Sequence, residues 1–281
     1  GSNSAALLED DYINQLFIGS TKDYLLFITN VGKAYWIKVH EIPESERTSR
    51  GAHIKSLLAV GPDEEITAVV SLKEFAEDQY LFMTTANGVV KKVHTTEFSN
   101  AKTRGIIGLK LDTGDKLISA IQTTGSTEVM LISRRGKALK IKEDSVRSMG
   151  RASRGIKGMK LAEGDEIAAA VKVEEGTGLI LVTEKGHGKR ISSDLFSTHG
   201  RGTGGQRIFG NIDGKGEIIG AVSICDSDEI VCMTSQGKTL RIKATEIKQQ
   251  GAGASGITIV KVSEPDYLVG IDKVQEKRDN E

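Results

Sequence analysis

The amino-acid sequence predicts an all-β, propeller-like fold built from small four-stranded sheets that repeat around an axis. Three observations predict it. The chain of 281 residues resembles itself at a period of about fifty residues. Each copy contains a hairpin signal between two β-prone runs, and no stretch has a convincing 3.6-residue periodicity. A charged fraction of 27% and an apolar fraction of 38% are typical of a folded globular domain.

Every copy opens with an apolar strand, a glycine turn and a second strand, as in "EVMLISRRGKALKIK". A glycine flanked by polar residues between two β-prone runs predicts a hairpin, because glycine accepts the positive φ that tight turns require. The turn glycines are Gly32, Gly88, Gly136, Gly186 and Gly237.

A second glycine follows about twenty residues later, and an acidic turn then precedes the last apolar strand, as in "EGDEIAAAVK". The second glycines are Gly51, Gly105, Gly155, Gly205 and Gly256. The predicted unit is therefore strand, hairpin, strand, long loop, strand, acidic turn, strand.

The repeats define five modules within a single domain, residues 8–275. Modules 1 to 5 span roughly residues 24–72, 79–122, 128–173, 178–223 and 229–274. Residues 10–19, "DDYINQLFIG", match the last strand of a module, so we expect them to belong to an incomplete sixth blade. Residues 1–7 and 276–281 are expected to be flexible tails.

Basic residues recur at fixed positions of the module, although the whole chain balances 38 Lys and Arg against 38 Asp and Glu. The fifth residue after each turn glycine is apolar and is predicted to face the core, and the fourth then lies on the opposite face of the strand. This fourth residue is Trp36, Lys92, Lys140, Arg190 or Arg241. Acidic residues gather around the acidic turn, so the zero net charge is a cancellation of two zones.

We predict that the recurring cations form one continuous stripe on an outer rim, because modules stacked around an axis repeat each position around it. The turns, the second strands and the loops before the second glycine all contribute. The predicted DNA-binding residues are Lys33, Arg47, Arg50, Lys91, Lys92, Lys102, Arg104, Arg134, Arg135, Lys137, Lys140, Lys142, Arg151, Arg154, Lys185, Lys189, Arg190, Arg201, Arg207, Lys238, Arg241 and Lys243.

A curved row of cations suits a polyanion with a long, regular backbone. Duplex DNA carries one charge per roughly 1.7 Å of axis, and Lys or Arg contacts release its counterions without reading bases. Such a row bends DNA when the contacts outweigh an elastic cost of about 1 to 6 kcal/mol for a segment of about 20 to 30 bp. Trp36 is a candidate for stacking on bases, and a structural role or a partner contact is the alternative.

No motif predicts an active site, a metal site or a cofactor. "TSQGKTL" ends like a phosphate-binding loop, but the position that requires glycine is Cys232, and the segment is one of five equivalent hairpins. The five histidines lack metal-ligand spacing. No apolar run reaches the roughly 20 residues of a membrane helix, and the N-terminus lacks a signal-peptide layout, so we expect a cytoplasmic location and no membrane partner.

The hairpins and loops resemble the C-terminal domain of the A subunit of bacterial DNA gyrase, from Asp10 to Val274. "FMTTANGVVKKVHTTEFSN", "EVMLISRRGKALKIKEDSVRSMG" and "GHGKRISSDLFSTHGRGTGG" are similar to successive blades of that family. The resemblance implies a six-bladed β-pinwheel whose basic perimeter binds and wraps DNA. It also implies that DNA cleavage and ATP hydrolysis belong to other parts of the gyrase A and B subunits, and that the isolated domain is a monomer in the cytoplasm, at the nucleoid.

Two alternatives stay open at this point. The related C-terminal domain of topoisomerase IV often has fewer blades, and five full modules plus a closing strand favour gyrase over it. A protein-binding propeller of the chromosome condensation regulator type has modules of similar length and many glycines. DNA binding through six or more phosphates weakens about a thousandfold or more between 50 and 200 mM salt, whereas a mostly apolar protein interface barely changes.

Overall fold

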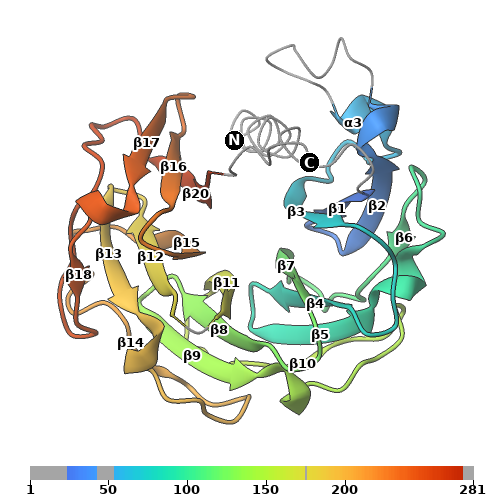
Figure 1. Ribbon diagram of the computed structural model, residues 1–281, viewed down its shortest axis with the longest axis horizontal. Helices are drawn as coiled ribbons and strands as arrows, with labels where there is room; N and C mark the ends of the chain where they lie inside the picture. Colours follow the sequence, from blue (N-terminus) through green and yellow to red (C-terminus); the bar gives the residue numbers. More distant parts are fainter. Residues whose placement is uncertain (1–23, 43–53, 175, 275–281) are drawn as a thin grey trace.

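The computed structural model describes residues 24–42, 54–174 and 176–274, whose regular structure consists mainly of short strands joined by turns and loops. Five small sheets follow one another around a ring (Figure 1). The predicted all-β, propeller-like class is confirmed. The strand predicted at residues 10–19, the two tails, and the candidate residues Arg47 and Arg50 lie outside the described residues.

Each module contributes three long strands to its own sheet, with the first strand in the middle. The first strands are β1 (Tyr24–Thr29), β4 (Tyr80–Thr85), β8 (Glu128–Ser133), β12 (Gly178–Thr183) and β16 (Glu229–Thr234). The second strands are β2 (Lys33–Lys38), β5 (Val89–His94), β9 (Lys137–Lys142), β13 (His187–Ser192) and β17 (Thr239–Lys243). The last strands, which line the inside of the ring in Figure 1, are β3 (Ile66–Leu72), β7 (Leu117–Thr123), β11 (Ile167–Val173), β15 (Ile218–Ile224) and β20 (Leu268–Lys273).

The outer edge of a sheet takes its fourth strand from the following module. β6 (Ile106–Ile107) pairs with β2, β10 (Ile156–Lys157) with β5, β14 (Gln206–Arg207) with β9, and β18 (Gln249–Gln250) and β19 (Ile257–Thr258) with β13. The sequence suggested that the four strands of one module form one sheet. In the structure they do not, because the fourth strand pairs with the preceding blade. The strand after the second glycine crosses to the preceding blade and ties the two modules together.

Short helices follow the second strands. They are the 3-10 helices η1 (Val39–Glu41), η2 (Thr95–Phe98), η3 (Glu143–Ser145), η4 (Ser193–Leu195) and η5 (Ala244–Glu246). α3 (Ile54–Leu57) is the one α-helix in the described part of the chain. The first residue of each 3-10 helix is buried, so this turn anchors the chain before it enters the long outer loop.

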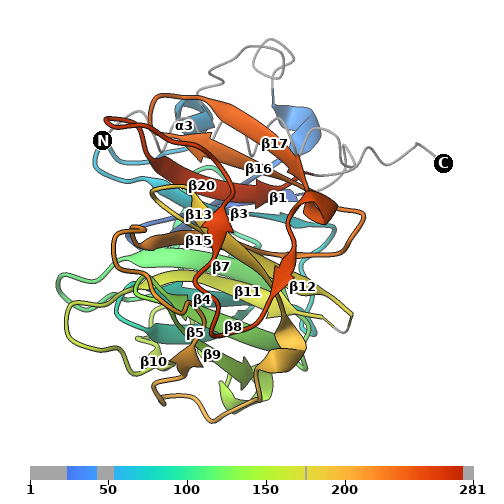
Figure 2. The ribbon, with the colours of Figure 1, turned by 90° about the vertical axis from the view of Figure 1, so that its left-hand side faces the viewer.

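The apolar core is divided into layers that lie between neighbouring sheets. In β1, Leu26 and Ile28 pack with residues of module 2, whereas Leu25 and Phe27 pack into a separate cluster on the other face. Because both faces of a sheet are covered, the first strands are continuous apolar runs and do not alternate with polar residues. Figure 2 shows the sheets of modules 3 to 5 following one another in this stack.

The turn glycines form the joints between modules. The Gly88 carbonyl accepts hydrogen bonds from the Gly158 and Met159 amides of the next module, at 2.8 and 3.1 Å. A Cβ on Gly88 would lie 2.6 Å from the Met159 carbonyl oxygen, and its φ is +87°. Glycine is therefore required twice here, for the turn and for the close approach. The carbonyls of Gly32, Gly136 and Gly186 accept equivalent bonds from the next module.

The sheet of module 5 differs from the others at its outer edge. Among the described residues, no strand pairs with the outer side of β17. Leu240 in this strand is 45% exposed, whereas Leu139 at the same position of module 3 is 1% exposed. The comparison shows how much of each second strand is buried by the neighbouring module.

Gly88→Ala should destabilise the domain more than Gly114→Ala. Both glycines have a positive φ, so each substitution costs about 1 to 2 kcal/mol for the left-handed backbone. At position 114 nothing lies within 4 Å of the added methyl group, whereas at position 88 it meets the Met159 oxygen. We expect an extra loss of about 1 to 3 kcal/mol for Gly88→Ala in urea unfolding. Equal losses would contradict a steric role of this glycine at the joint.

Candidate nucleic-acid interface

Four segments without Asp or Glu lie along the outer edge of the ring. Each outer strand of modules 2 to 5 and the loop around it is rich in Lys and Arg, and residues 99–110, 147–160, 197–210 and 247–261 contain no Asp or Glu. The cations of these segments are Lys102, Arg104, Lys110, Arg147, Arg151, Arg154, Lys157, Lys160, Arg201, Arg207, Lys248 and Lys261. All except Arg151, which is partly buried, are exposed.

Neighbouring outer segments are hydrogen-bonded to one another. The Lys110 amide donates to the Ser153 carbonyl at 3.1 Å, and the Lys160 amide donates to the Thr203 carbonyl at 2.9 Å. The Gly210 amide donates to the Ala254 carbonyl at 2.9 Å. The cations of successive modules therefore lie on one connected backbone surface. We call this surface, residues 99–110, 147–160, 197–210 and 247–261, the basic rim.

Two arginines of the basic rim also hold it together. The Arg151 guanidinium donates to the Ile107 carbonyl at 3.1 Å, and the Arg201 guanidinium donates to the Lys157 carbonyl at 3.2 Å. Each therefore connects its own loop to the outer strand of the preceding module. Arg154 forms an ion pair with Asp112 at 3.2 Å, but both side chains are more than half exposed, so solvent screens this pair.

The residues of the predicted stripe on the second strands do not belong to the basic rim, and in modules 1 to 4 their side chains contact the following module. The Trp36 indole donates to the Phe98 carbonyl at 3.0 Å, Lys92 to the Glu143 carbonyl at 3.4 Å, and Arg190 to the Ala244 carbonyl at 3.0 Å. Every acceptor belongs to the 3-10 helix of the following module. Lys140 makes the same kind of contact, to the Ser193 and Phe196 carbonyls. The recurrence of a donor at this position reflects a joint between modules.

These joint cations also have acidic partners. Lys92 lies 3.9 Å from Glu143, Lys140 lies 3.4 Å from Glu128, and Arg190 is paired with Asp226. The exposed fractions of the three basic side chains are 8, 11 and 12%. The assignment of these residues to a phosphate-binding stripe is therefore corrected, because neutralised and buried cations do not reach a DNA backbone. Arg241, in module 5, is 64% exposed and pairs with Glu229.

Trp36 lies in an aromatic cluster. Its ring centroid is 4.9 Å from that of Tyr24 and 5.7 Å from that of Phe75. Together with the bond to Phe98, these contacts give Trp36 a structural role in the joint between modules 1 and 2, which was the alternative to base stacking.

The assignment of Lys91 and Lys189 to DNA binding is also corrected. Both side chains are completely buried, and neither ammonium reaches the surface. Burial lowers the pKa of Lys91 to about 8, and burial also lowers the pKa of Lys189 to about 8. Each ammonium binds backbone carbonyls, so neither is available to phosphate.

The remaining predicted cations lie at strand ends and turns. Arg134 and Arg135 face the acidic turn of module 4, where Arg134 binds Glu217 at 2.6 Å and Arg135 lies 4.0 Å from it. The basic turn and the acidic turn of consecutive modules thus meet, and here the two charge zones neutralise each other. Lys33 is partly buried, and the other members of this group, Lys137, Lys142, Lys185, Lys238 and Lys243, are exposed.

Sequence reasoning missed half of the basic rim. Lys110, Arg147, Lys157, Lys160, Lys248 and Lys261 were not among the predicted residues. The signal that points to them is the lack of any carboxylate over stretches of twelve or more residues, which recurs in four modules.

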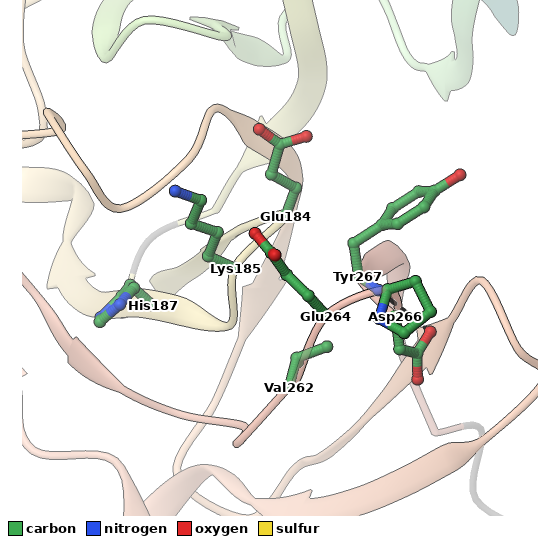
Figure 3. A pocket seen from close by; sticks show the side chains of 8 residues that line it. Glu184, Lys185, His187, Val262, Glu264, Asp266 and Tyr267 are labelled. Atoms are coloured by element: carbon green, nitrogen blue, oxygen red, sulfur yellow. Dashed lines mark hydrogen bonds between the residues drawn. The ribbon is translucent and has the colours of Figure 1, made fainter.

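A pocket of about 560 Å³ lies at the joint between modules 4 and 5 (Figure 3). Its walls carry Glu184, Glu264 and Asp266 beside Lys185 and His187. Three carboxylates make this pocket unsuited to a phosphate backbone. In residues 24–42, 54–174 and 176–274, no group of three or more His, Cys, Asp or Glu side chains could hold a metal ion. None of the helices described here is long and apolar enough to cross a membrane.

A family described as "DNA gyrase C-terminal domain, beta-propeller" matches residues 23–73, 79–124, 127–174, 179–225 and 228–275. The chain belongs to this family. The five matched segments coincide with the five modules, so each gyrase-type repeat corresponds to one module. Family membership takes the place of the chromosome condensation regulator alternative.

Relatives and solved structures agree with this membership. The chain is 61% identical over 276 residues to the DNA gyrase A subunit of Treponema pallidum (strain Nichols), covering 98% of the chain and 34% of that protein. It is 38% identical over 281 residues to the DNA gyrase A subunit of Escherichia coli (strain K12), covering 100% and 32%. The chain thus spans about a third of the length of these gyrase proteins.

A solved gyrase A C-terminal domain matches with a TM-score of 0.81 and 32% identity, over 91% of this chain and 83% of that one. A solved C-terminal domain of DNA topoisomerase IV matches with a TM-score of 0.79 and 27% identity, over 91% and 80%.

Arg190→Met should destabilise the domain, whereas Arg241→Met should not. Arg190 donates to the carbonyl of the buried Ala244, which would lose its charged donor, at a cost of about 1 to 3 kcal/mol. Arg241 holds the same strand position but is exposed, and exposed substitutions change the free energy of unfolding by about 0.5 kcal/mol or less. Urea unfolding of both variants measures the difference. If Arg190→Met lowers the free energy of unfolding no more than Arg241→Met does, Arg190 does not stabilise the joint between modules 4 and 5.

The double substitution Lys91→Met and Lys189→Met should change how the free energy of unfolding depends on pH. Since both pKa values are lowered in the folded state, the unfolded chain binds more protons between pH 8 and about 10. The stability of the parent chain therefore rises with pH over this range, relative to the variant, by at most about 1.4 kcal/mol per pH unit for each lysine. Urea unfolding of both chains from pH 7 to pH 9.5 measures this change. If the free energy of unfolding of the parent chain, minus that of the variant, falls as the pH rises, the lowered pKa values are contradicted.

Proposed function

We propose that this domain binds duplex DNA along the basic rim, without reading its sequence, and bends it around the ring. The observation that carries the proposal is the absence of carboxylates from residues 99–110, 147–160, 197–210 and 247–261, together with the exposure of their cations. Exposed Lys and Arg side chains displace condensed counterions from DNA, and this term depends on charge and not on base sequence.

The position of the basic rim supports bending. The outer strands β6, β10, β14 and β18 follow the perimeter of the ring in Figure 1, so a duplex that contacts successive modules has to curve. Smooth bending of about 20 to 30 bp costs about 1 to 6 kcal/mol. Phosphate contacts spread over four modules offset this cost, because each additional module adds several cations to the same curved path.

The family gives this binding a place in a larger enzyme. We infer that the chain acts with the remainder of a gyrase A subunit, together with a gyrase B subunit, in an ATP-dependent type II topoisomerase of the cytoplasm that introduces negative supercoils. In this proposal the domain supplies a wrapped DNA segment, and the active sites lie in other parts of the enzyme. The similarity to gyrase A subunits from two organisms, over the whole chain, supports this assignment.

The topoisomerase IV alternative rests on the similarity of fold. That likeness, at 27% identity, is close to the 32% identity to the gyrase domain. We favour gyrase because the relatives named above are gyrase A subunits.

Replacing Arg104, Lys157 and Arg207 together by Gln should weaken DNA binding and leave unfolding nearly unchanged. The three exposed cations come from the outer segments of modules 2, 3 and 4. Each phosphate contact contributes about 0.9 to the slope of log affinity against log salt, so we expect the slope to fall by about 2 to 3. Gel shifts with a linear duplex over a range of salt concentrations measure it.

The matched control replaces Lys73, Lys116 and Lys185 by Gln. These lysines are also exposed and give the same change in net charge, but they lie outside the basic rim. The control should keep the parent slope. If both sets reduce the slope equally, DNA responds to overall charge and the basic rim has no special role.

A further inference from the structure

We propose that Lys91 and Lys189 are positioning residues for DNA binding, each holding the outer loop of the next module in the shape that presents its cations. The inference rests on the proposed function of the basic rim. It concerns two side chains that touch no DNA themselves, because both are completely buried.

The Lys91 ammonium uses all three of its protons. Nζ donates to the Gly108 carbonyl at 2.9 Å, to the Arg151 carbonyl at 2.7 Å and to the Ser153 carbonyl at 2.8 Å. Gly108 belongs to module 2, like Lys91, whereas Arg151 and Ser153 lie in the outer loop of module 3. One buried cation therefore connects the backbone of the rim in two consecutive modules.

Lys189 repeats this arrangement two modules later. Nζ donates to the Ile208 carbonyl of its own module at 2.8 Å, and to the Gly251 and Ala252 carbonyls of module 5 at 2.6 and 2.9 Å. The Phe209 ring centroid lies 5.8 Å from Nζ. Lys91 and Lys189 both stand third after a turn glycine, so the same position builds the same three-carbonyl site twice.

The charge of these lysines is balanced by carbonyl dipoles. In the described part of the chain, neither lysine forms an ion pair with a carboxylate. The position does not require a charge for packing, because Leu139 occupies it in module 3 and is equally buried. Compared with an apolar side chain, the ammonium adds three hydrogen bonds to backbone carbonyls, two of them in the outer loop of the next module.

Those loops carry cations of the basic rim. The loop held by Lys91 contains Arg147, Arg151 and Arg154, and it leads into Lys157 of β10. Arg151 is fixed at both ends, since its carbonyl binds Lys91 and its guanidinium binds Ile107. A loop that is ordered before binding loses less conformational entropy on DNA than a mobile one, so the buried lysine strengthens DNA binding through the loop.

Lys91→Met tests the inference. Met fills a similar volume, as Leu139 does in its own module, but it cannot donate to the three carbonyls. The Gly108 and Arg151 carbonyls then lose the Lys91 donor, and the Ser153 carbonyl keeps only the Lys110 amide. Buried carbonyls without partners favour opening of the loop to water. In the absence of DNA, we expect amide hydrogen exchange in residues 150–155 to be faster by about tenfold or more, with the rest of the chain unchanged. DNA affinity should fall about three- to tenfold at fixed salt.

Lys189→Met is the matched control, and the two variants should act on different loops. Lys189→Met should accelerate exchange in residues 249–254 and leave residues 150–155 at the parent rate. Either variant provides the test if the other does not fold. Unchanged exchange in the held loop, or equal acceleration in both loops for each variant, would overturn the positioning role.

A double-mutant cycle separates this inference from the proposed function. In a chain that already carries Arg154→Gln and Lys157→Gln, Lys91→Met should weaken DNA binding less than in the parent chain, because two of the four cations that it positions are gone. An equal effect in both backgrounds would overturn the inference. Parent-level DNA binding by Arg154→Gln and Lys157→Gln would instead contradict the proposed function, and the exchange rates would still test whether Lys91 holds the loop.

Discussion

The structure depends on a backbone contact that only glycine permits. At each described joint between modules, the carbonyl of a turn glycine accepts amides from the following module, and at Gly88 and Gly186 a Cβ would lie within 2.6 Å of the oxygen of a residue in that module. The close approach lets the next outer loop lie against the edge of the sheet, where it adds a short strand. The positive φ and the missing Cβ of the turn glycines thus allow consecutive modules to pack against one another around the ring.

The exchange of strands determines where charge is displayed. Because the outer strand of each of the first four blades comes from the next module, the loops on either side of it lie on the perimeter and are bonded to one another, as between Lys110 and Ser153. Carboxylates are absent from these segments and are frequent at the acidic turns. At Arg134 and Glu217 an acidic turn meets a basic one. The perimeter therefore carries an excess of exposed basic charge, which is the surface a curved polyanion would follow.

Basic residues have two separate uses in this fold. On the rim, Lys157 and Arg207 are exposed at the ends of outer strands. At the joints, Lys92 and Arg190 donate to carbonyls of the next module, and Lys91 does so deep in the structure. The two uses are chemically similar, since a carbonyl and a phosphate oxygen both accept hydrogen bonds from Lys and Arg, but only the first leaves a charge for a ligand.

The sequence by itself determined the repeat, the hairpins at the turn glycines and the all-β class, because each follows from local periodicity and from the φ that glycine accepts. It also indicated that basic residues recur by module. Only the tertiary structure decided which of them face solvent. Strand alternation assigns a residue such as Lys92 to a face, but the outer edge of that face is covered by a strand and a helix from the next module, some fifty residues away. Burial is a property of that neighbour, which no local pattern of residues encodes.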